Sequence, residues 1–153
     1  IDIFKISNVE DYKKAKLNCL NLEREFIFEE EIGGKEFTVT IIGNQCYPVI
    51  EIKTQNDFYD YDAKYISDDT ILDQAKLSDN ELNTINDIAL RAFHALKCSG
   101  WARVDIIQDI NGDFNVIEIN TVPGMTSHSC VPKSGGFMGL SYQDVIKEIL
   151  SNV

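Results

Sequence analysis

The sequence has 153 residues, of which 44% are hydrophobic and 25% are charged, as in a soluble protein with one core-bearing domain. Its formal net charge of −11 argues against nucleic acid and anionic membranes as partners, because both bind basic surfaces. The four cysteines are scattered without metal-ligand spacing, and no stretch approaches transmembrane length. We therefore expect free thiols and a cytoplasmic protein.

The N-terminal part of the chain predicts a helix followed by a strand. The helix should cover residues 7–22 and open with a capping box between Ser7 and Glu10. The alternating segment 26–32 then predicts a strand that ends at the Gly33-Gly34 pair. The acidic residues of this segment, taken alone, indicate a solvated surface.

The next segment predicts a hairpin and then a long loop. Residues 36–42 and 45–52 read as two strands joined by a turn at Gly43-Asn44. Pro48 places the second strand at an edge or a bulge, because proline cannot donate to a sheet ladder. Residues 54–77 show no sustained periodicity, which predicts a long ordered loop with either a functional or a packing role.

Two further helices are predicted. Residues 78–97 carry one apolar stripe at helical spacing, preceded by a capping box between Ser78 and Glu81. Ser99-Gly100 should end this helix. A last helix should begin after Ser141 and run through Leu150.

Between these helices lies the strongest hairpin signal in the chain. The alternating runs 101–110 and 113–120 flank Asn111-Gly112, a pair typical of two-residue turns. In the register that such a turn sets, Asp105 lies directly opposite Glu118. Two facing carboxylates repel each other, so we expect a positively charged group or ion between or beside them.

The same register places Arg103 opposite Asn120 and puts both on the face that carries the acids, together with Trp101, Ile107 and Val116. The other face, which includes Ile117, is predicted to belong to the core. A divalent cation would relieve the repulsion, and carboxylate and amide oxygens are ligands that suit magnesium. The alternative is a structural ion cluster in which Arg103 neutralises the acids.

The hairpin runs directly into residues 121–136, a segment rich in small and polar residues that begins with the turn pair Pro123-Gly124. We expect a loop here whose main-chain N–H groups can hold a carboxylate or an oxyanion. The alternative is an ordinary surface connection. His128 and Ser129 do not indicate a hydrolase, because the sequence lacks the G-x-S-x-G elbow.

Four motifs carry a family resemblance: G-G-K-E-F-T-V (33–39), F-Y-D-Y-D-A-K-Y (58–65), G-W-A-R-V-D (100–105) and E-I-N-T-V-P-G-M-T-S-H-S (118–129). In this order they resemble the C-terminal part of D-alanine–D-alanine ligase, an ATP-grasp family. The resemblance implies an α+β fold, the ATP-grasp C-terminal lobe, with a mostly antiparallel sheet flanked by helices. Because the chain opens as a mid-domain strand without an initiator Met, we expect residues 1–153 to be the C-terminal ATP-grasp region of a longer ligase. The N-terminal and most of the central region would then be absent.

The resemblance implies an ATP-dependent enzyme of peptidoglycan precursor synthesis. ATP would phosphorylate one D-alanine, and a second D-alanine would attack the acyl phosphate to give D-alanyl-D-alanine. The implied partners are ATP and two D-alanine molecules, in a cytoplasmic protein whose family also allows a homodimer. The alternatives are another ATP-grasp carboxylate–amine ligase and a non-catalytic acidic cation-binding or interaction module.

The resemblance also implies a role for particular residues of this chain. The implied metal ligands, for two magnesium ions with manganese as an alternative, are Asp105, Glu118 and Asn120. The implied nucleotide-binding residues are Glu29, Glu30, Ile32, Glu36, Phe58 and Lys64. The implied catalytic residues are Arg103, Gly124 and Ser129, and the implied substrate-binding residues are Tyr65, Ser129 and Cys130.

Overall fold

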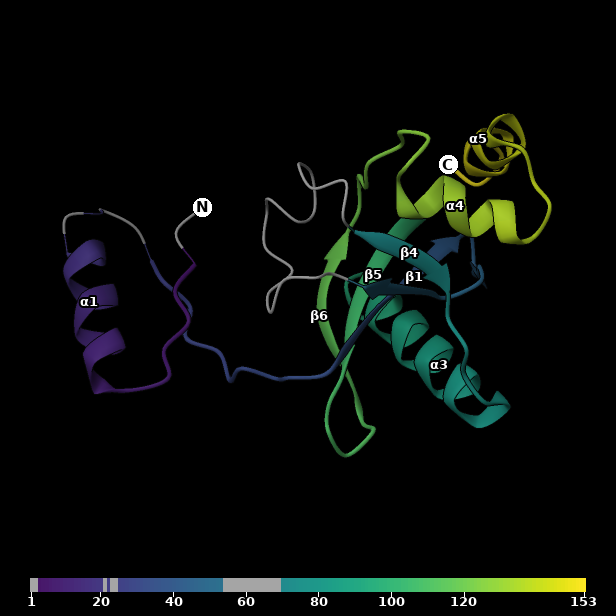
Figure 1. Cartoon of the computed structure of the whole chain (residues 1–153). Coiled ribbons are helices and arrows are strands. Elements are labelled where there is room, and N and C mark those ends of the chain that lie inside the picture. The colour runs from purple at the N-terminus through teal and green to yellow at the C-terminus, as the bar shows by residue number, and fades with distance from the viewer. Residues whose placement is uncertain (1–2, 21, 23–24, 54–69) are drawn as a thin grey trace. The chain divides into compact units, whose positions relative to one another are not determined.

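The structure is a computed structural model that describes residues 3–20, 22, 25–53 and 70–153. The chain divides into two compact units, Ile1–Ile32 and Gly33–Val153 (Figure 1). Within the described ranges, no helix is long and apolar enough to cross a membrane. The four cysteines are free thiols, as expected.

The first unit contains the helix α1, Val9–Cys19. Its N-cap is Asn8, whose side chain accepts hydrogen bonds from the backbone N–H groups of Glu10 and Asp11. The predicted capping box at Ser7 is therefore wrong by one residue. The Ser7 N–H instead donates to the Asp11 carboxylate over 3.2 Å.

The predicted strand at 26–32 is also wrong, because residues 25–32 form no strand. An extended segment needs a neighbouring strand to satisfy its backbone groups, and the described part of this unit offers none. The segment is instead held by side chains. The rings of Tyr12 and Phe28 lie 6.3 Å apart, and Lys5 forms an ion pair with Glu31.

The second unit is built on an antiparallel sheet in the order β4-β3-β1-β5-β6, with β2 paired to β1. The strands are β1 (Lys35–Ile42), β2 (Gln45–Cys46), β3 (Ile50–Lys53), β4 (Ile71–Gln74), β5 (Trp101–Gln108) and β6 (Phe114–Asn120). This arrangement confirms the predicted mostly antiparallel sheet.

The first hairpin of the sheet follows the sequence prediction. Its turn is at Gly43, which has a φ of +62°. The second predicted strand is divided into two strands, β2 and β3, and Pro48 lies in the gap between them. The predicted long loop at 54–77 needs correction, because β4 lies within it and pairs with β3 at the sheet edge.

Side chains on one face of β1 and β5 pack against α3 (Asp79–Ala95). The predicted capping box of this helix, Ser78 with Glu81, is confirmed. The core on this face consists of Phe37, Val39, Ile41, Ala102, Val104, Ile106 and Phe114 from the strands, Val49 from the segment before β3, and Ile85, Ala89 and Phe93 from α3. Burial of these apolar side chains is the main force that fixes the register of the central strands.

The opposite face is covered by α4 (Cys130–Phe137) and α5 (Tyr142–Ser151), as Figure 1 shows. The predicted capping box of the last helix at Ser141 is confirmed. The loop predicted over 121–136 is shorter than expected, because α4 begins at Cys130. Two contacts fix α4: the Ser134 hydroxyl donates to the Pro48 carbonyl over 2.6 Å, and Gly135 packs so closely on α5 that a Cβ there would lie 2.3 Å from Val145.

The second hairpin differs from the prediction at its turn. Asp109 and Asp113 pair across the strands through a 2.9 Å backbone hydrogen bond, so the loop has three residues, 110–112, instead of two. Gly112, at φ +91°, occupies the left-handed position that ends such a loop.

A β-bulge compensates for this longer turn. Asp105 pairs with Glu118 but Ile106 pairs with Val116, which leaves Ile117 as the extra residue on β6. Val116 therefore lies opposite Ile106, on the α3 side, and not on the face of the acids as predicted. Ile117, predicted to be core, is 52% exposed.

Candidate functional site

The polar residues of the central strands gather on the sheet face that α4 covers. The predicted pairs are confirmed: Asp105 lies opposite Glu118, and Arg103 lies opposite Asn120. On the other side of β5, Thr38 of β1 lies opposite Asp105. The antiparallel register thus brings residues from three strands to one place.

Arg103 and Asp105 form a bidentate ion pair at the centre of this group. Arg103 Nε donates to Asp105 Oδ1 over 2.8 Å, and Arg103 Nη2 donates to Oδ2 over 2.7 Å. Their side chains are only 12% and 8% exposed, so water screens the pair weakly. The neutralising role that the sequence left open for Arg103 is therefore present in this structure.

The oxygen atoms around Asp105 are suited to a magnesium ion, although a metal role for them stays a proposal. A carboxylate has about four lone-pair positions, and Asp105 uses two on Oδ1 and one on Oδ2 for Arg103 and Thr38. One position on Oδ2 thus stays open to a metal. The exposed Glu118 and the half-buried Asn120 add hard oxygen ligands. Across the described ranges, no three His, Cys, Asp or Glu side chains cluster as metal ligands, so water and substrate oxygens would have to complete the shell.

The N-terminus of α4 forms the second part of the site. Ser129 is its N-cap residue, but the Ser129 side chain makes no capping hydrogen bond to the helix. Its Oγ instead accepts from the Thr126 N–H over 3.0 Å and lies 2.9 Å from the Thr126 hydroxyl. The first N–H groups of the helix therefore have no cap from Ser129, and such groups attract anions.

Gly124 lies next to Ser129, as the prediction of a common catalytic role requires. A Cβ at position 124 would be 3.2 Å from Ser129 Oγ, so a larger residue would press on the serine. The structure thus brings Gly124 and Ser129 together at the start of α4. Their catalytic roles stay predictions.

Cys130 connects the two parts of the site. It is the first residue of α4, is buried against Ile50 and Ile52, and is close enough to Arg103 and Asp105 for both charges to act on it. Burial raises the pKa of the Cys130 thiol to about 11. The thiol is therefore protonated and uncharged at neutral pH. The group of Cys130 that is suited to bind an anion is its backbone N–H.

Of the predicted nucleotide-binding residues that it describes, the structure places one, Glu36, on the sheet of the second unit. Glu36 is half-buried on β1, two residues from Thr38 and on the same face. Glu29, Glu30 and Ile32 belong to the first unit, so their predicted contact with adenine stays a prediction. Phe58, Lys64 and Tyr65 lie outside the described residues.

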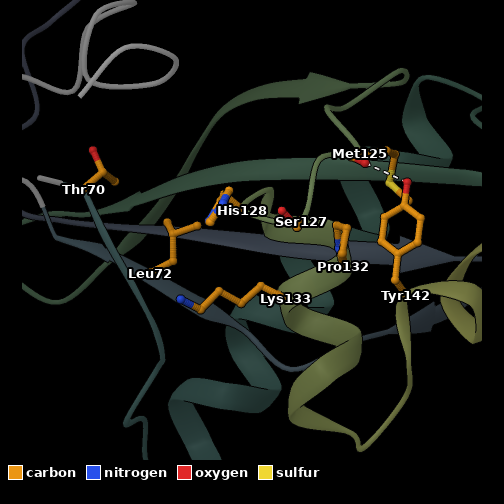
Figure 2. Close-up of a pocket in the computed structure, with 8 residues that line it drawn as sticks. All are labelled: Thr70, Leu72, Met125, Ser127, His128, Pro132, Lys133 and Tyr142. Carbon is orange, nitrogen blue, oxygen red and sulfur yellow. Dashed lines mark hydrogen bonds between the residues drawn. The ribbon is translucent and has the colours of Figure 1, made fainter. Parts of the chain in front are cut away.

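A cavity of about 530 Å³ opens beside the start of α4 (Figure 2). It is lined by Thr70, Leu72, Met125, Ser127, His128, Pro132, Lys133 and Tyr142. The Tyr142 hydroxyl donates to the Met125 carbonyl over 2.8 Å, which ties α5 to the loop that carries Gly124 (Figure 2). Lys133 reaches into the space between α4 and β4 and gives this cavity a positive charge (Figure 2).

The sequence predicted no functional role for Thr38, and for Tyr142 only an inward position on the last helix, whereas Tyr142 is 46% exposed. The available signal for Thr38 was a polar side chain inside the apolar alternation of β1. Tyr142 carried no such signal, because its hydroxyl meets a carbonyl 17 residues away.

The family model described as "D-ala D-ala ligase C-terminus" matches residues 1–151. The chain belongs to this family. The D-alanine--D-alanine ligase of Mannheimia succiniciproducens is 38% identical over 151 residues, which are 98% of this chain and 49% of that relative. This D-Ala-D-Ala ligase C-terminal chain spans about half the length of the curated relatives that it matches.

Solved ligase structures share the fold. A D-alanine--D-alanine ligase from Bacillus anthracis complexed with ATP has a TM-score of 0.80 and 28% identity, over 94% of this chain and 46% of that one. The VanG D-Ala:D-Ser ligase from Enterococcus faecalis has a TM-score of 0.68 and 31% identity, over 80% of this chain and 37% of that one. The predicted α+β ATP-grasp C-terminal lobe is thereby confirmed.

Proposed function

We propose that this chain is the C-terminal part of a longer, full-length ligase, and that this ligase joins two D-alanine molecules in an ATP-dependent reaction. The observation that carries the proposal is the family match over 1–151, which includes the polar sheet face and the start of α4. The γ-phosphoryl group of ATP would pass to a carboxylate oxygen of the first D-alanine, with release of ADP. The amine of the second D-alanine would then attack the acyl carbon, lose a proton and displace phosphate.

The start of α4 is suited to the carboxylate of the second D-alanine. The N–H of Cys130 lies at the positive end of the helix, and the Ser129 hydroxyl lies beside it. No covalent enzyme intermediate is needed, so Ser129 binds and orients without acting as a nucleophile. The N–H of Gly124, next to Ser129, is suited to the oxyanion of the tetrahedral intermediate.

Arg103 is suited to stabilise the negative charge that develops at the reacting carbonyl. Its guanidinium is oriented by two bonds to Asp105, so it would reorganise little during the reaction. Asp105, Glu118 and Asn120 would hold magnesium, which would supply positive charge to the phosphate oxygens. Manganese would serve in its place.

The remaining assignments complete the proposal. Glu29, Glu30 and Ile32 would contact adenine, Glu36 the ribose, Phe58 and Lys64 the rest of the nucleotide, and Tyr65 the substrate side. ATP binding by the Bacillus anthracis relative supports this assignment of the nucleotide. A cytoplasmic location and a homodimer belong to the same proposal.

The test is ADP formation by the full-length protein that carries this chain, assayed with D-alanine, L-alanine, D-lactate and D-serine side by side. We expect ADP release to depend on D-alanine and to yield D-alanyl-D-alanine. D-serine is included because one relative of known structure is a D-Ala:D-Ser ligase. A protein that releases no ADP with any of the four would contradict the proposed function.

A further inference from the structure

Thr38 places a hydroxyl group directly against the central carboxylate of the site. It lies on β1 opposite Asp105 and is only 1% exposed. Its Oγ1 is 2.8 Å from Asp105 Oδ1 and 3.3 Å from the Val104 carbonyl. A hydroxyl has one proton, and both the shorter distance and the negative charge favour donation to Asp105.

This bond decides which oxygen of Asp105 is available. Among the residues that the structure describes, Oδ1 accepts from both Thr38 and Arg103 Nε, whereas Oδ2 accepts from Arg103 Nη2 alone. With Oδ1 saturated, the open lone-pair position belongs to Oδ2. The hydroxyl and the guanidinium together prevent rotation of the carboxylate, because rotation would break three bonds at once.

Thr40 provides an internal comparison. It lies two residues along β1 on the same face, opposite Arg103, and is also 1% exposed. Within the part of the chain that the structure describes, however, the Thr40 hydroxyl has no hydrogen-bond partner. The two threonines therefore share strand, face and burial but differ in the one contact with Asp105.

We propose that Thr38 is a positioning residue that orients the Asp105 carboxylate so that Oδ2 faces the metal bound with the nucleotide. The inference rests on the proposed function. Groups that orient a metal ligand through a hydrogen bond change metal affinity by about 10–100-fold when they are removed. Thr38→Val removes the hydroxyl and keeps the shape of the side chain, whereas Thr38→Ser keeps the hydroxyl.

The experiment measures Mn²⁺ binding in the presence of ADP by the electron paramagnetic resonance signal of free Mn²⁺, on the full-length protein. We expect Thr38→Val to weaken Mn²⁺ binding by about tenfold or more. Thr38→Ser should stay within about twofold of the parent, and the matched control Thr40→Val should leave binding unchanged. Equal Mn²⁺ affinities for Thr38→Val and Thr40→Val would overturn the inference.

A second pair of variants and an activity assay of the parent separate a folding defect and a failed function from a failure of this inference. If Thr38→Val does not fold by circular dichroism, Thr38→Ala and Thr40→Ala replace the pair, with the same expected difference. Failure of the proposed function would appear as a parent that forms no ADP with D-alanine. Failure of this inference alone would appear as an active parent whose Mn²⁺ binding does not respond to loss of the Thr38 hydroxyl.

Discussion

Arg103 has a structural and a proposed catalytic role, and its burial links the two. The guanidinium neutralises Asp105 at a place where both side chains are largely removed from water. Removing one partner of such a pair leaves an uncompensated buried charge, which costs roughly 3–5 kcal/mol. Replacement of Arg103 must therefore be assessed for stability and turnover together.

For Arg103→Ala we expect a loss of turnover of about 10²–10³-fold, because the guanidinium acts on transition-state charge. We also expect the urea midpoint to fall. Steady-state kinetics and urea unfolding of the full-length protein measure both effects. The control is Arg91→Ala, whose guanidinium pairs with Asp87 on the exposed surface of α3 and should affect neither quantity. Unchanged phosphate release by Arg103→Ala in the presence of D-alanine would remove its proposed role.

The chain adopts an unusual backbone conformation at the end of α3. Lys97 has a φ of +54°, in the left-handed region that favours glycine. The Lys97 N–H donates to the His94 carbonyl over 2.9 Å, and the Cys98 N–H donates to the Phe93 carbonyl over 3.0 Å. This is the hydrogen-bond pattern of a Schellman motif, which usually has glycine at the position of Lys97.

Lys97→Gly should therefore stabilise the fold by about 0.5–1 kcal/mol, since relief of left-handed strain exceeds the extra entropy of glycine in the unfolded chain. Urea unfolding measures the change. Ala95→Gly is the matched control, because Ala95 is the last helical residue and has no such strain to relieve. It should destabilise by up to about 1 kcal/mol. A lower midpoint for Lys97→Gly would show that the lysine side chain contributes more than the strain costs.

The hairpin of β5 and β6 shows how far sequence reasoning extends. Alternation correctly placed the apolar residues of β5 against α3. The pairing of Asp105 with Glu118 was predicted from a two-residue turn, and the pairing is confirmed although that turn is not. The sequence did not predict the third residue of the turn or the bulge at Ile117. The extra residue in the turn shifts the pairing by one, and the bulge shifts it back before Asp105 and Glu118. Periodicity reports which residues face the core, but it does not report a single inserted residue whose side chain is exposed.

Two elements escaped prediction for different reasons. β4 is a four-residue edge strand with mixed polar and apolar side chains, so it has no alternation that distinguishes it from a loop. α4 contains Gly135 and Gly136, which disfavour helices, and its first turn holds Pro132. Close packing on α5 requires the glycine at 135, so a tertiary contact outweighs the local propensity.

At the scale of the whole molecule, the apolar core belongs to the second unit. The described clusters of buried apolar residues all lie between Phe37 and Ile149. Among the described residues of the first unit, Ala15 alone is buried. Stability and the predicted adenine contacts therefore depend on different parts of the chain.

We predict that residues 33–153 fold without residues 1–32, with a urea midpoint close to that of the whole chain, because they retain every described core cluster. The single tryptophan, Trp101, packs against the cluster under α5 and reports unfolding by its fluorescence.

The matched control ends at residue 141 and lacks α5, which removes the buried Val145 and Ile149. It should lose roughly 3 kcal/mol or more, at about 1.5–3 kcal/mol for each buried aliphatic side chain. In the full-length protein, deletion of the segment matching 1–32 should abolish ATP binding, since Glu29, Glu30 and Ile32 would be lost. Unfolding of 33–153 in the absence of urea would show that the first unit contributes to the core after all.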